Sequence, residues 1–131
     1  MKLKPKVTII TATYNSESSI FHTLESVRNQ SYQNIEHLII DGASIDSTVK
    51  ICNTFSHIHK IISEPDKGIY DAFNKGILMS SGDIIGFLNS DDVLYDSNSI
   101  QNIVDGFSYN VDCVFGNLII TDTNNRLIRE W

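Results

Sequence analysis

Residues 84–92 read Ile84-Ile85-Gly86-Phe87-Leu88-Asn89-Ser90-Asp91-Asp92, an apolar run that ends abruptly in an amide, a hydroxyl and two neighbouring carboxylates. An apolar run of this length is typical of a buried strand. Such a strand would carry the polar groups to the edge of a sheet, where their oxygens can hold a hard divalent cation such as Mg²⁺ or Mn²⁺. The same residue types commonly begin turns and helices, so a capped helix or a solvated turn is the alternative.

The composition is that of one folded domain. The chain has 131 residues, of which 41% are hydrophobic and 20% are charged, enough for one ordinary core and unlike a disordered chain. We therefore expect a single domain over residues 1–131. The formal charge of −6 argues against nucleic acid as a partner, because nonspecific binding needs basic patches that neutralise phosphates.

The apolar runs are short and the cysteines are isolated. None of the apolar runs approaches the roughly 20 residues that a helix needs to cross a bilayer. The basic start at residues 1–6 leads directly into a strand-like run. We expect a cytoplasmic protein, and peripheral association with the inner face of the membrane is compatible with this. Cys52 and Cys113 lie in apolar stretches without metal-ligand spacing, which predicts buried free thiols.

Strand-like and helix-like stretches alternate along the chain. Apolar and β-branched runs predict strands at residues 7–13, 35–40, 58–62 and 84–88. Caps and apolar residues at helical spacing predict four helices. The first is capped by residue 18 or 19, the second is capped at residues 46–47 and ends near residue 55, and the other two cover residues 69–79 and 100–107. Residues 111–121 predict a strand pair or one long strand, followed by a turn at 122–126 and a last short strand.

This alternation predicts an α/β fold, with a Rossmann-like, mostly parallel sheet and helices on both faces. Ligands of such sheets bind outside the carboxyl ends of the strands. Four polar segments meet at that rim: Thr13-Tyr14-Asn15, Asp41, Asp66-Lys67 and Asn89 to Asp92. Each could be a local turn, but four of them at strand ends favour a shared site. The sequence lacks a Gly-rich phosphate loop, so a nucleotide phosphate would depend mainly on a metal and a few side chains.

The ordered set of these motifs strongly resembles the family 2 glycosyltransferases. The matching segments are residues 7–15, 41–48, 64–76 and 82–92, which together extend over most of the chain. The resemblance implies an A-type glycosyltransferase fold, truncated at its C-terminal side, and a divalent metal, Mg²⁺ or Mn²⁺. It also implies a nucleotide-diphospho-sugar donor, usually uridine- or thymidine-linked.

By position, the resemblance assigns Thr13, Tyr14 and Asn15 to the base pocket and gives Asp41 a hydrogen bond from the pyrimidine. An aromatic ring offers stacking, and a carboxylate distinguishes an N–H edge from an acceptor edge. For Tyr14 the alternative is a packing aromatic near a strand end. The resemblance also places Asp66-Lys67 near the ribose and diphosphate, with Lys67 as a compact positive charge; the alternative is a solvated loop pair.

Asn89-Ser90-Asp91 occupies the place of the family's Asp-any-Asp metal motif. The resemblance makes Asp91 the first metal ligand, turns Asn89 toward the ribose or a metal-bound water, and gives Asp92 a supporting place at the metal. The sequence departs from the common pattern twice, because Asn89 replaces the first Asp and Gly42 stands where many members have a second Asp. Both departures lower the negative charge of the site.

The implied activity is transfer of a sugar, with inversion, to a glycan or lipid-linked acceptor, as in polysaccharide biosynthesis. Inversion needs a general base that takes the proton of the acceptor hydroxyl. In the family this carboxylate lies farther along than Trp131, and neither Asp112 nor Asp122 matches a base motif. We therefore expect the nucleotide-sugar-binding portion of a longer enzyme. The alternatives are a noncatalytic nucleotide-sugar-binding module, a flavodoxin-like phosphoacceptor domain, and a domain whose acidic rim only forms turns.

Overall fold

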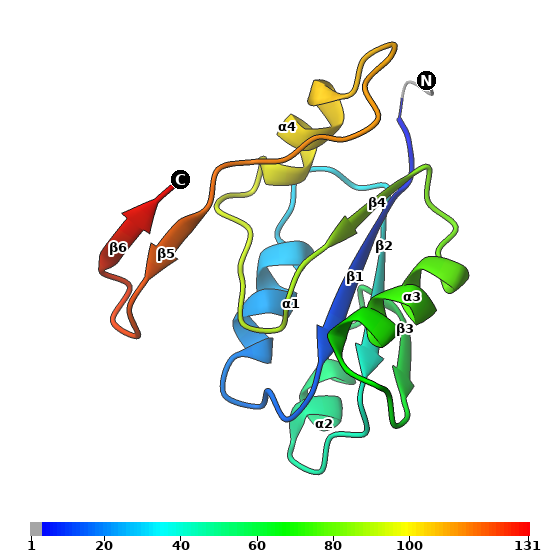
Figure 1. Ribbon diagram of the computed structural model, residues 1–131, viewed down its shortest axis with the longest axis vertical. Helices are drawn as coiled ribbons and strands as arrows, with labels where there is room; N and C mark the ends of the chain where they lie inside the picture. Colours follow the sequence, from blue (N-terminus) through cyan, green and yellow to red (C-terminus); the bar gives the residue numbers. More distant parts are fainter. Residues whose placement is uncertain (1–3) are drawn as a thin grey trace.

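A four-stranded parallel sheet forms the centre of the computed structural model, which describes residues 4–131 (Figure 1). The first three residues of the predicted domain lie outside the described part. The strands pair in the order β3-β2-β1-β4, and their bounds are Val7–Thr13 (β1), Ile35–Asp41 (β2), Ile58–Ser63 (β3) and Ile84–Phe87 (β4). β1 and β2 align from Val7↔Ile35 to Thr13↔Asp41, so their carboxyl ends lie level. The predicted α/β class and parallel sheet are confirmed.

Helices cover both faces of this sheet (Figure 1). On one face, Ile10 and Leu38 pack with Ala72 of α3 (Ile69–Met79). The opposite face carries α1 (Ile20–Arg28), α2 (Thr48–Cys52) and α4 (Ser99–Gly106). All seven residues of β1 are buried because helices pack on both of its sides. None of the helices in residues 4–131 is long and apolar enough to cross a membrane.

The predicted helix over residues 69–79 is confirmed at both ends, whereas α2 ends at Cys52, earlier than predicted. The chain tightens there, since Thr54 N and Phe55 N donate to the carbonyls of Ile51 and Cys52, three residues back. Such bonds close a tighter turn than an α-helix.

The C-terminal segment departs most from expectation. β5 (Ile119–Thr121) and β6 (Leu127–Glu130) form their own antiparallel pair, away from the main sheet (Figure 1). Of the strand predicted over 111–121, only the last three residues form one. The predicted turn at 122–126 is confirmed, with Asp122 Oδ1 accepting two backbone N–H groups. Cys52 is buried as predicted, but Cys113 is exposed, because it lies in the extended segment outside the core.

Candidate functional site

A pocket of about 750 Å³ opens at the carboxyl-end edge of the sheet. Its walls are the segment after β1, the loop before α3 and the loop after β4. The residues that line it are Ala12, Thr13, Tyr14, Asn15, Ser16, Ser18, Ser19, Asp66, Gly68, Ile69, Ala72, Asn89, Ser90 and Asp91. Six of the predicted site residues are therefore brought together in one hollow, as the strand-end rule requires.

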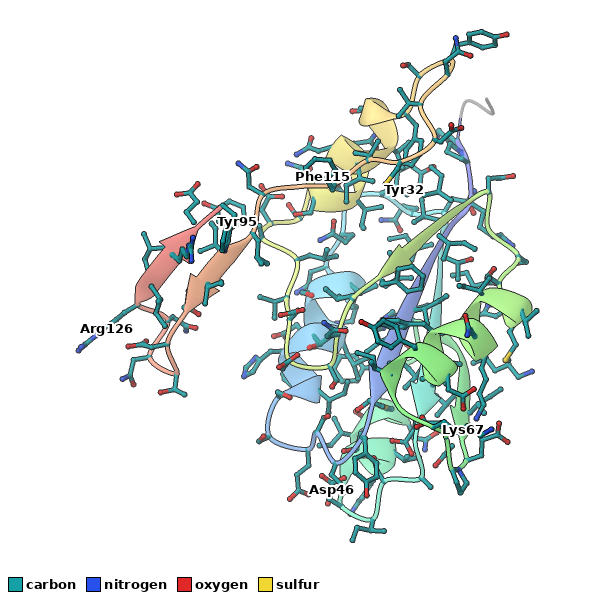
Figure 2. The ribbon with its side chains drawn as sticks, viewed as in Figure 1. Tyr32, Asp46, Lys67, Tyr95, Phe115 and Arg126 are labelled. Atoms are coloured by element: carbon teal, nitrogen blue, oxygen red, sulfur yellow. The ribbon has the colours of Figure 1, made fainter. Side chains whose placement is uncertain are left out.

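Three predicted residues, Asp41, Lys67 and Asp92, lie outside this lining. Figure 2 shows Lys67 near the pocket end of the molecule and Tyr32 toward the other end. A second, smaller hollow of about 270 Å³ lies beside Tyr32 and is also lined by Lys4 and Gln101. It contains none of the predicted site residues.

The wall after β1 is held by hydrogen bonds to the loop that leads into α2. Asn15 has a left-handed backbone (φ 47°), a conformation that asparagine tolerates better than most residues. Its side-chain oxygen accepts from Ile45 N at 2.9 Å, and Ser16 N donates to Thr48 Oγ1 at 2.7 Å. Tyr14 lines the pocket and is 64% exposed, so its side chain does not pack in the core.

Asp41 lies beneath this wall and is fully buried. Its Oδ1 accepts from Ser44 Oγ, while its Oδ2 accepts from Ser44 N at 2.9 Å and from Ser63 Oγ at 2.6 Å. Ser44 Oγ in turn accepts from Asn15 N at 2.8 Å. The carboxylate thus sets the shape of the wall through Ser44.

Gly42 leaves room for the carboxylate of Asp66 because it has no side chain. A Cβ at position 42 would lie 2.9 Å from Asp66 Oδ2, closer than such atoms approach. The other oxygen of Asp66 accepts from Gly68 N at 2.9 Å, which closes a tight turn. The space that a side chain at 42 would take is therefore filled by Asp66, so a carboxylate remains in this part of the pocket.

Lys75 is a supporting residue that the sequence analysis missed. Its Nζ lies 3.1 Å from Glu64 Oε1 and 3.7 Å from Asp71 Oδ2, and it donates to the carbonyl of Pro65 at 3.2 Å. The hydrogen bond with Glu64 is the chief cause that raises the pKa of Lys75. The i,i+4 spacing of Asp71 and Lys75 on one helix is the signal that could have revealed it.

The acidic end of β4 carries two neighbouring carboxylates, and both residues are exposed. Asp91 is exposed and lines the pocket. Asn89 Nδ2 donates to Asp92 Oδ2 at 3.2 Å, and burial, followed by the charge of Asp91, raises the pKa of Asp92. Within residues 4–131, no group of three or more His, Cys, Asp or Glu side chains could hold a metal ion. The donor set fits a cation such as Mg²⁺ that one or two carboxylates share with substrate phosphates.

Hydroxyl groups complete the pocket. Thr13 Oγ1 is buried and has no hydrogen-bond partner in the described part of the chain, although Thr13 lines the pocket. Leaving such a group unpaired costs about 1–3 kcal/mol, so a ligand that pairs it would bind more tightly. Ser16 Oγ and Ser90 Oγ lie 2.8 Å apart and join two walls. No sequence pattern indicates a role in binding for either serine.

Comparison with known proteins identifies the family of this chain. The family model described as Glycosyl transferase family 2 matches residues 8–130. The chain belongs to this family. A glycosyltransferase of PGL/p-HBAD biosynthesis from Mycobacterium bovis is 31% identical over 131 aligned residues, which cover 93% of this chain and 50% of that protein. The chain spans about half the length of this relative.

Solved structures share the fold. The mannosyltransferase PcManGT from Pyrobaculum calidifontis, solved with GDP-Man and Mn²⁺, matches with a TM-score of 0.73 at 22% identity. The match covers 95% of this chain and 38% of that protein. TarS residues 1–349 from S. aureus, solved with UDP-GlcNAc, match with a TM-score of 0.70 at 23% identity. This match covers 76% of this chain and 30% of that one. These similarities confirm that this member of the family 2 glycosyltransferases has the A-type glycosyltransferase fold.

Proposed function

We propose that the pocket binds the nucleotide diphosphate of a sugar donor, and that the protein transfers the sugar with inversion to a glycan or lipid-linked acceptor. The observation that supports this most is the meeting of Thr13, Tyr14, Asn15, Asp66, Asn89 and Asp91 in one hollow. The family supports sugar transfer. A nucleotide-sugar donor is further supported by the similar folds solved with UDP-GlcNAc and GDP-Man.

The base would lie against the wall after β1. The exposed ring of Tyr14 is available for stacking, and the unpaired hydroxyl of Thr13 can donate to or accept from the ligand. Asp41 already accepts three hydrogen bonds, which leaves one acceptor position of the carboxylate for a pyrimidine N–H. Because Asp41 is fully buried, the loop that carries Ser44 would have to shift to allow this contact.

The diphosphate would lie between the loop before α3 and the acidic end of β4. Asp91 would hold Mg²⁺ or Mn²⁺, with Asp92 behind it and Asn89 facing the ribose or a metal-bound water. When bound, the metal would neutralise charge on the diphosphate leaving group. Asp66 would accept from the ribose, and the exposed ammonium of Lys67 would add positive charge beside the phosphates. We propose a cytoplasmic location, with which peripheral association at the inner face of the membrane is compatible.

A noncatalytic nucleotide-sugar-binding module is the second candidate. Its supporting observation is that neither Asp112 nor Asp122 of the C-terminal segment suits a general base at the pocket: Asp122 is engaged in its own turn, and Asp112 is exposed outside the pocket lining. Turnover separates the two candidates. Hydrolysis or transfer of a donor by this chain would exclude the module.

Titration calorimetry tests the proposed binding. UDP and GDP are titrated into the protein with Mn²⁺ and again with a chelator. We expect one nucleotide to bind more tightly with Mn²⁺, and Asp91→Asn to lose this gain while Asp112→Asn keeps it. Failure of both nucleotides to bind a folded sample with Mn²⁺ present would overturn the proposal.

A further inference from the structure

A polar stripe runs along the side of α1 that faces the loop after β4. It consists of Ser16, Ser19, Thr23, Ser26 and Gln30, which recur at spacings of three and four residues. Such spacings put side chains on one side of a helix. α1 itself covers Ile20–Arg28, so the stripe begins in the pocket wall and continues just past the helix. Thr23 is fully buried and Gln30 is 5% exposed.

The loop after β4, residues 88–98, is called the acidic loop from here on. The polar stripe binds its backbone at every second residue. Ser19 Oγ donates to Ser90 O at 2.8 Å, and Thr23 Oγ1 donates to Asp92 O at 2.7 Å. Two further contacts continue the series, from Leu94 N to Ser26 Oγ at 3.1 Å and from Gln30 Nε2 to Asp96 O at 2.7 Å. The partners are residues 90, 92, 94 and 96, the period of an extended chain. Figure 1 shows this loop running beside α1 before it reaches α4.

Both ends of the polar stripe are tied to neighbouring structure. At the pocket, Ser16 Oγ pairs with Ser90 Oγ at 2.8 Å. At the far end, Gln30 Oε1 accepts from Ile100 N at 2.9 Å and so satisfies a free N–H in the first turn of α4. Because most of the contacts are made to main-chain atoms, they fix the path of the loop whatever side chains it carries.

We propose that the polar stripe is a set of positioning residues that holds Asp91 at the pocket for its cation. This inference rests on the proposed function. Asp91 lies between two residues whose carbonyls are anchored, Ser90 and Asp92. Neighbouring carboxylates repel each other, so an unheld loop would let them move apart. A metal ligand must stay within about 0.5 Å of its productive position, and the anchored carbonyls on either side supply that restraint.

Thr23 provides the sharpest test. Thr23→Val keeps the shape but removes the donor to Asp92 O, and Thr23→Ser restores a hydroxyl. The matched control is Thr11→Val, since Thr11 is also fully buried and its hydroxyl lies 2.9 Å from His37 Nε2, away from the acidic loop. Equal loss of melting temperature in the two valine variants would show that they destabilise the fold alike.

The measurement is NMR of the labelled protein titrated with Mn²⁺ alone, followed by UDP. Mn²⁺ should broaden the amide signals of residues 89–92, and Thr23→Val should weaken the apparent Mn²⁺ affinity about tenfold, as loss of a supporting contact does at metal sites. Thr23→Ser and Thr11→Val should bind Mn²⁺ like the wild type.

Three results would overturn the inference. They are unchanged Mn²⁺ affinity in Thr23→Val, an equal loss in Thr11→Val, and absence of broadening at residues 89–92 in the wild type. If Mn²⁺ binds, Thr23→Val weakens it as expected, and UDP binds neither protein, then the proposed function fails while the positioning role of the polar stripe stands.

Discussion

Asp41 and the backbone of Asn15 are joined through one hydroxyl, because Ser44 Oγ donates to Asp41 Oδ1 and accepts from Asn15 N at 2.8 Å. The first residue is fully buried and the second lines the pocket. A carboxylate at the end of β2 therefore shapes a pocket wall that it does not itself reach.

Ser44→Ala should destabilise the protein by about 1–3 kcal/mol, because the buried carboxylate loses a donor and Asn15 N loses an acceptor. Urea unfolding measures the change in the free energy of unfolding. Ser56→Ala, at an exposed serine, is the control and should change it little. Equal values for the two variants would contradict the role given to Ser44.

Gly42→Ala should destabilise the protein by about 0.5–1.5 kcal/mol, because its Cβ would lie 2.9 Å from Asp66 Oδ2 and the displaced carboxylate would lose its hydrogen bond from Gly68 N. Asp66→Ala removes the obstructing carboxylate. The same glycine substitution made in the Asp66→Ala background should then cost much less, which a double-mutant cycle measures as coupling. Additive losses would show that the two positions are independent.

Gly68→Ala should cost about 1–3 kcal/mol from backbone strain alone. Gly68 has φ 106° and ψ −178° at the start of α3, and a Cβ there would meet no described atom within 4 Å. Gly116 is the matched control. A Cβ there is equally unobstructed among the described residues, but Gly116 does not have a positive φ. Thermal unfolding should separate Gly68→Ala from Gly116→Ala, and equal melting temperatures would refute the strain argument.

Stability should fall as the pH drops below about 6.5, the ordinary pKa of histidine. Burial, and then the neighbouring His57, lowers the pKa of His37 to about 3, while burial and Arg28 lower that of His57. The unfolded chain therefore binds protons that the folded chain excludes. Each such proton lowers the free energy of unfolding by about 1.4 kcal/mol for every unit that the pH falls. The loss from His37 continues until the pH reaches the folded-state value of about 3.

Urea unfolding between pH 7 and pH 5 measures this slope, because Glu36, whose pKa is lowered from 4.5 to about 2, contributes only at lower pH. His37→Gln should flatten the profile and His22→Gln, at an exposed position, should leave it unchanged. A profile that stays equally steep in His37→Gln would contradict the assignment.

The sequence predicts local elements well where one pattern is sufficient. The helix at 69–79 follows from its apolar spacing and from the residues on either side, and the strand-end rule correctly brings Thr13, Asp66 and Asp91 to one edge of the sheet. Residues 111–118 have the composition of a strand but form none, because a strand needs a partner and composition alone does not supply one.

Burial and tertiary partners explain the remaining differences. Asp41 ends a predicted strand, yet no local pattern shows that Ser44 and Ser63 enclose its carboxylate. Likewise, the polar stripe resembles a solvent-facing side of a helix. Periodicity indicates which residues share a side, but it does not distinguish water from the backbone of a loop as their partner.

The location of nucleotide binding is the most direct test of the proposed site. NMR of the labelled protein titrated with UDP and Mg²⁺ should shift the amide signals of Tyr14, Asn15, Gly68, Ser90 and Asp91, which line the larger pocket. Shifts confined to the smaller hollow at Lys4, Tyr32 and Gln101, or the absence of shifts in the folded protein, would contradict the account.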